Sequence, residues 1–123
     1  SELMDRIGAY WDENKHNAHK GASGNLYTKE SMDLDISVDD FSEPWGDYRK
    51  HLQVCLDNYF KEYPESDTLQ NTFNIHENYN LQWYAKGGGF KSWHLENAGN
   101  LASIHRHLVF MTYVDEYFFP CKF

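Results

Sequence analysis

The sequence predicts an α+β fold, or a helix-supported β-sandwich, in a single domain of 123 residues. Apolar side chains recur every three or four residues over 44–63, the spacing of one helix face. Beyond Pro64, apolar and polar residues alternate, as in strands with one buried face. Because helices precede strands, we expect residues 1–64 to provide helical support and an acidic loop, and residues 65–123 to form a β-strand core.

The N-terminal half divides into three expected segments. Residues 3–20 are polar and weakly helical, and the glycines, serines and aspartates of residues 21–44 indicate an irregular acidic loop. The helix of residues 44–63 has Ser42 as its expected N-cap and ends before Pro64. This helix is the element that the pattern predicts most directly.

The C-terminal half alternates short β-like runs with turns. Gly87, Gly88 and Gly89 indicate one turn, and residues 97–100 indicate another. Strands are expected at residues 73–75, 79–83, 90–96, 103–115 and 117–123. Together they would form a meander that packs on the preceding helices.

The overall charge and composition limit the classes of partner. A net charge of −8 argues against nucleic acid and anionic membrane surfaces, which require basic patches. No apolar run approaches the roughly 20 residues that span a bilayer, and no secretory leader is recognisable, so a cytoplasmic location is expected. Cys55 is expected to be a small core residue of the helix, and Cys121 has no recognisable partner.

His94 and Glu96 form the most informative pair. In a strand, residues two apart point to the same face, so an imidazole and a carboxylate could bind one metal ion together. Such a pair is two-thirds of the facial triad that suits non-haem Fe(II). By itself the pair is weak evidence, because a chain with seven histidines also produces it as a surface His and Glu.

The flanking residues carry a resemblance to a known family. Residues 79–96, YNLQWYAKGGGFKSWHLE, and residues 105–115, HRHLVFMTYVD, resemble the first metal motif and the following strand of the 2-oxoglutarate- and Fe(II)-dependent oxygenases. The similarity is to the prolyl-4-hydroxylase-like branch, in the version found in marine phages and bacteria. Residues 28–36 resemble an upstream segment of the same version, so the resemblance covers most of residues 25–115.

The resemblance implies a fold, two cofactors and three site residues. It implies N-terminal helices packed on a double-stranded β-helix, a jelly-roll or cupin-like fold, with Fe(II) and 2-oxoglutarate as cofactors. His94 and Glu96 would be the first two iron ligands, and Tyr84 would lie near the 2-oxoglutarate or pack in the sheet. Gln82 and Trp93 are expected to be structural. If the protein is phage-encoded, its location would be the host cytoplasm.

The sequence departs from the family pattern after Asp115. The second motif, Gly-Gly-x-Thr-x-Phe, the distal histidine and the basic residue that pairs with 2-oxoglutarate are not recognisable, so we expect a truncated and weakly active or inactive member with an incomplete jelly-roll. The alternative is a non-catalytic jelly-roll fragment that self-associates through open sheet edges. The His105–His107 and His16–His19 pairs are expected to lie on the surface.

Overall fold

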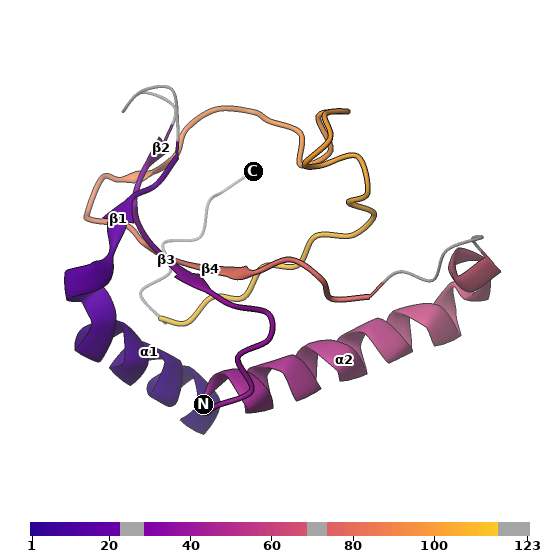
Figure 1. Ribbon diagram of the computed structural model, residues 1–123, viewed down its shortest axis with the longest axis horizontal. Helices are drawn as coiled ribbons and strands as arrows, with labels where there is room; N and C mark the ends of the chain where they lie inside the picture. The colour runs from indigo at the N-terminus through magenta and orange to yellow at the C-terminus, as the bar shows by residue number, and fades with distance from the viewer. Residues whose placement is uncertain (23–28, 69–73, 116–123) are drawn as a thin grey trace.

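The computed structural model describes residues 1–22, 29–68 and 74–115 and has a mixed α+β architecture, as the sequence predicts. Two helices lie along one side of small antiparallel sheets, and the chain beyond the sheets forms a wide irregular loop (Figure 1). No helix of these residues is long and apolar enough to cross a bilayer. The elements are α1 (Glu2–Asn14), a 3-10 turn (Lys15–Asn17), β1 (His19–Lys20), β2 (Lys29–Glu30), β3 (Met32–Ile36), α2 (Trp45–Glu62), a 3-10 turn (Pro64–Thr68), β4 (Tyr79–Trp83) and β5 (Gly89–Phe90).

The helix predicted over residues 44–63 is α2, which ends at Glu62, two residues before Pro64. The predicted N-cap was wrong. No side chain caps this helix, because the hydroxyl of Ser42 donates its hydrogen bond to the Asp40 carboxylate instead. The interpretation of Cys55 as a core residue was also wrong, since its side chain is exposed. Only the first half of α2 packs against the sheet, and its far end extends away from it (Figure 1).

The prediction of an irregular acidic loop over residues 21–44 was wrong for the middle of this segment. Met32–Ile36 forms β3, the central strand of the sheet β1-β3-β4. Leu34 and Ile36 alternate with acidic residues and are buried, which is the pattern of a strand. The aspartates hid this pattern because aspartate is depleted in strands and typical of loops.

The strand predicted at residues 79–83 is confirmed as β4, which pairs antiparallel with β3. The strands predicted at 90–96 and 103–115 were wrong. Only Gly89–Phe90, which forms β5 against β2, belongs to a ladder, and residues 91–115 are irregular or turn. Their period-two pattern has no strand partner within the described ranges, so no ladder forms. The strand predicted at 117–123 and Cys121 lie outside the described residues.

The hydrophobic core lies between the sheet and the first turns of the two helices. Its buried apolar members within the described residues are Ile7, Leu34, Ile36, Trp45, Leu52 and Tyr79. All but Tyr79 come from the N-terminal half. We expected the core to lie in residues 65–123, but the described part of that segment contributes little buried apolar area.

Candidate functional site

His94 and Glu96 lie on the irregular segment that follows β5, and their side chains are exposed. The expected strand is absent here, yet the two side chains still converge. The Nε2 atom of His94 is 3.0 Å from Oε1 of Glu96. The bends of the segment, in place of strand alternation, bring the imidazole and the carboxylate together.

This separation suits two ligands of one metal ion. A nitrogen and an oxygen each about 2.1 Å from a metal lie about 3.0 Å apart when they occupy adjacent octahedral positions. The same distance allows a hydrogen bond between the two groups while no metal is bound. The donor set, one imidazole and one carboxylate, is suited to Fe(II) and similar divalent ions.

The backbone carbonyl of Ser92 orients the imidazole. It lies 3.2 Å from Nδ1 of His94, so a proton on Nδ1 can be donated to it. When a metal ion takes the place of the Nε2 hydrogen beside Glu96, Nδ1 keeps its proton for the Ser92 carbonyl, which is the arrangement of a metal-binding histidine. The Phe90 ring stacks on the imidazole with 4.0 Å between centroids and restricts its rotation.

Arg106 holds the carboxylate from the other side. Its Nη1 donates to Oε2 of Glu96 at 3.3 Å and to the Glu96 carbonyl oxygen at 3.1 Å. Two further hydrogen bonds of 2.8 Å join the same guanidinium to both carboxylate oxygens of Glu77. These hydrogen bonds lower the pKa of Glu77 and raise the pKa of Arg106, so both groups stay charged.

Within the described ranges, no group of three or more His, Cys, Asp and Glu side chains is placed to hold a metal ion. His105 and His107 are exposed, as the sequence predicts. The described structure therefore offers two convergent ligands at His94 and Glu96, and it does not bring a third histidine or acid to them.

Tyr84, the residue expected near 2-oxoglutarate, follows β4 directly. Its hydroxyl donates a 2.6 Å hydrogen bond to Oε1 of Gln82. Partial burial and the nearby negative charge of Asp33 raise the pKa of Tyr84, so the phenol stays protonated and keeps its donor hydrogen. Its position beside Asp33 places it at the polar face of the sheet.

A buried polar cluster around Asp33 lies on that face, and it was not predicted from the sequence. Asp33 is 2% exposed, and its carboxylate accepts hydrogen bonds from Lys29 at 2.8 Å, Ser31 at 2.6 Å and Asn80 at 3.1 Å. The ammonium of Lys29 also lies 5.9 Å from the Phe90 ring centroid. Phe90 thus touches both this cluster and His94. The alternation of Asp33 and Asp35 with Leu34 and Ile36 was the signal that could have revealed it.

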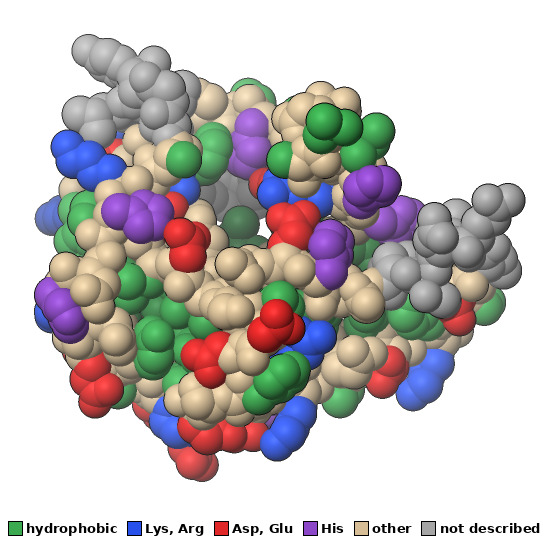
Figure 2. Space-filling model, viewed as in Figure 1, with side chains coloured by type: hydrophobic (Ala, Val, Ile, Leu, Met, Phe, Trp, Pro, Cys, Tyr) green, Lys and Arg blue, Asp and Glu red, His purple; other side chains and the backbone are tan. Residues whose placement is uncertain are grey.

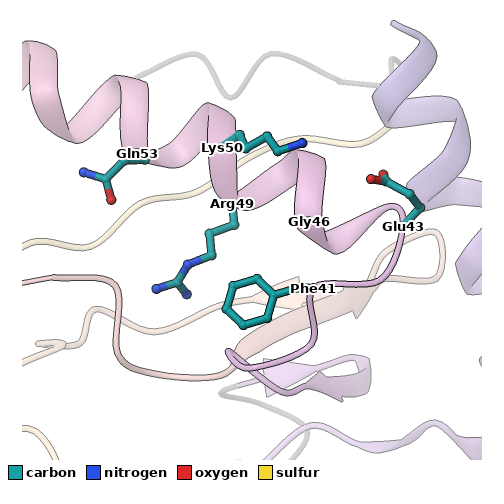
Figure 3. A pocket seen from close by; sticks show the side chains of 6 residues that line it. All are labelled: Phe41, Glu43, Gly46, Arg49, Lys50 and Gln53. Carbon is teal, nitrogen blue, oxygen red and sulfur yellow. The ribbon is translucent and has the colours of Figure 1, made fainter.

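One pocket of about 300 Å³ lies away from these residues, at the start of α2. Figure 3 shows Arg49 reaching toward Phe41, while Lys50 points to another side of the helix. Arg49 is already bound to the carbonyl oxygens of Val38 and Ile75, so it ties two loops to the helix. We therefore assign this pocket a structural role and place the candidate site at His94 and Glu96.

Several exposed apolar side chains lie on the same irregular segment as the candidate site. Trp93 is fully exposed and Leu101 is 94% exposed. Figure 2 shows hydrophobic side chains at the surface of the loop that carries Leu101, near histidine side chains.

The chain was compared with known proteins, and no protein-family model, no curated protein and no solved structure matches it. The assignment of the candidate site therefore depends on the geometry of His94 and Glu96.

Proposed function

We propose that this chain is a 2-oxoglutarate- and Fe(II)-dependent dioxygenase-like protein of the prolyl-4-hydroxylase-like type. His94 and Glu96 would supply the first two iron ligands. The observation that carries the proposal is the 3.0 Å approach of Nε2 and Oε1 between the two residues of the family-like motif, with Glu96 held by Arg106 from its other side. The jelly-roll that the motif implies is part of the same proposal.

The residues of the chain have distinct parts in this proposal. His94 presents its Nε2 lone pair while Nδ1 keeps its proton for the Ser92 carbonyl, and Glu96 presents Oε1. Tyr84 keeps its hydroxyl proton and would donate it to a 2-oxoglutarate carboxylate. With molecular oxygen as the oxidant, iron and 2-oxoglutarate would, when bound, supply hydroxylation of the substrate, with one oxygen atom going to the substrate and the other to succinate as 2-oxoglutarate loses CO2. With two protein ligands, metal affinity and turnover should be low.

Removal of His94 should abolish the metal site. We expect the 123-residue protein to bind Co(II), a stable neighbour of Fe(II) in the affinity series. His94→Ala should weaken binding by more than about tenfold, since even the loss of an outer partner costs that much. Isothermal titration calorimetry and the visible spectrum of bound Co(II) measure the change.

The matched control is His19→Ala. Nε2 of His19 lies 3.0 Å from an Asp35 oxygen, and its Nδ1 lies 3.1 Å from the Lys20 carbonyl, so the local geometry matches that of His94. The proposal requires His19→Ala to retain Co(II) binding. If His19→Ala loses the metal and His94→Ala keeps it, the site is misassigned. Fe(II)-dependent succinate release of about 1 per second or more would contradict the expected low turnover.

The number of exposed apolar side chains in residues 91–115 favours a second candidate function, a non-catalytic module that pairs with its own copy. Isolated apolar residues are ordinary on a surface, but Trp93 and Leu101 lie in one irregular loop with Leu95 and Met111, which are also exposed. Within the described chain, β4 pairs with β3 along one edge only, which leaves an edge open for a further strand.

Charge placed on this surface should weaken self-association. If two copies pair through the loop, sedimentation velocity should show a concentration-dependent dimer that Leu101→Glu shifts toward monomer. Val54→Glu is the control, because Val54 is an exposed apolar residue of α2 and does not belong to the loop. A wild-type monomer at all concentrations would rule out the second candidate.

A further inference from the structure

Arg106 connects the candidate metal ligands to the folded part of the chain. Its guanidinium binds Glu77, two residues before β4, through a pair of 2.8 Å hydrogen bonds. The same guanidinium reaches both the side chain and the carbonyl of Glu96. The fork shape of arginine makes this possible, because its five donors point in fixed directions.

The loop between Glu96 and Arg106 is closed on itself by side-chain amides. The amide nitrogen of Asn97 donates to the carbonyl oxygens of Ile104 at 3.3 Å and of Arg106 at 3.2 Å. Asn100 accepts from the backbone nitrogen and the hydroxyl of Ser103, which is buried. These contacts reverse the direction of the chain. As a result, Arg106 lies beside Glu96 in space although ten residues separate them in the sequence.

We propose that Arg106 is a positioning residue for a divalent metal ion held by His94 and Glu96. By holding Oε2 and the carbonyl oxygen, it leaves Oε1 turned toward His94. An exposed glutamate otherwise samples many rotamers and loses that freedom when it binds a metal. Because Arg106 already restricts the Glu96 side chain, Glu96 loses less rotamer freedom when it binds the metal. This inference rests on the proposed metal-binding function of the pair.

Charge repulsion alone predicts that Arg106 lowers the affinity for the metal, which is the opposite of the positioning effect. A guanidinium beside a metal site repels the cation, so its removal would tighten metal binding if electrostatics were its only role. Glu77 already neutralises part of that charge through its ion pair with Arg106. The sign of the change in metal affinity therefore separates positioning from repulsion.

Two substitutions make the test. Arg106→Gln removes the charge, and Arg106→Lys keeps the charge but cannot span Glu77 and Glu96 with a planar fork. Positioning predicts that both variants bind Co(II) about tenfold more weakly than the wild type, the usual effect of losing an outer partner. Repulsion predicts tighter binding by Arg106→Gln and little change in Arg106→Lys.

The matched control is Arg6→Gln. Arg6 also bridges two carboxylates, Glu43 and Asp47, and its side chain is 36% exposed against 34% for Arg106. This variant should bind Co(II) as the wild type does. If Arg106→Gln folds poorly, Arg106→Lys still decides the question, because it keeps the charge and loses the fork: positioning predicts weaker Co(II) binding, and repulsion predicts little change.

The visible spectrum of bound Co(II) supplies a readout that a merely structural role would not change. If Arg106 positions Glu96, the visible absorption spectrum of bound Co(II) should change in both Arg106 variants, even at saturating Co(II). Unchanged affinity, or tighter binding by Arg106→Gln, overturns the positioning role and leaves the His94–Glu96 site intact if His94→Ala still loses the metal. A wild-type protein that binds no Co(II) overturns the proposed function and this inference together.

Discussion

Asp33→Asn should lower the free energy of unfolding by about 3 to 5 kcal/mol, because it breaks the buried ion pair between Lys29 and Asp33. Lys29 and Asp33 are both buried, and the distance between Nζ and Oδ2 is 2.8 Å. Equilibrium urea unfolding, followed by tryptophan fluorescence, measures the change. The substitution is nearly isosteric, so the loss reports charge and hydrogen bonding and not a change in volume.

Asp35→Asn is the control on the same face of β3. Asp35 is exposed and pairs with exposed His19, so its loss should change stability by less than about 1 kcal/mol. The double variant Lys29→Met with Asp33→Leu should recover much of the stability lost in Asp33→Asn, because an apolar pair leaves no buried charge. Equal losses for Asp33→Asn and Asp35→Asn would contradict the importance of the buried pair.

Acid provides a second readout of the same pair. Burial alone raises the pKa of the Asp33 carboxyl, but the hydrogen bonds from Lys29, Ser31 and Asn80 outweigh it and set the pKa below its usual value. A carboxyl with a depressed folded-state pKa stabilises the protein above its unfolded pKa of about 4, and this contribution is lost as pH falls through the folded pKa. The stability difference between wild type and Asp33→Asn should therefore narrow below about pH 4.

Trp45→Ala should lower the free energy of unfolding by about 3 to 5 kcal/mol, the usual cost of emptying a large aromatic site in a core. Trp45 is 2% exposed and lies at the start of α2, where it packs against the rings of Tyr10, Tyr48 and Tyr79. The cavity would open where α1, α2 and β4 meet. Urea and thermal unfolding measure the loss.

Two further variants test the origin of that loss. Trp93→Ala removes the same side chain from a fully exposed position and should change stability by less than about 0.5 kcal/mol. Trp45→Phe should cost less than its reduced volume suggests, because the buried Nε1 of Trp45 has no hydrogen-bond partner among the described residues. A Trp45→Ala variant as stable as Trp93→Ala would contradict the location of the core.

The elements that the sequence predicted correctly are those with a long, clean period. The apolar stripe of α2 extends over five turns, and Pro64 defines its end, so both the helix and its boundary were predictable. β4 was predictable because Tyr79, Leu81 and Trp83 alternate with polar residues. β3 was not, because Asp33 on its polar face is buried by an ion pair with Lys29 and a hydrogen bond from the Ser31 hydroxyl, and these contacts carry no sequence period.

The two candidate ligands could be predicted from the sequence, but the residues that orient them could not. The motif around His94 and Glu96 named the two side chains, and their convergence stays within one short segment. The Ser92 carbonyl and the Glu77–Arg106 bridge depend on bends and on contacts between distant residues, which carry no sequence period. The strands predicted around the site failed for a related reason, since alternation cannot show whether a partner strand is present.

The pairing of β3 with β4 also determines the order in which this chain can fold. Ile36 lies opposite Tyr79, so all of α2 is enclosed between two strands that must meet. Helices form within about a microsecond from local contacts, whereas a long closure must first overcome chain entropy. The encounter of β3 with β4, and not the formation of either helix, should therefore control the folding rate.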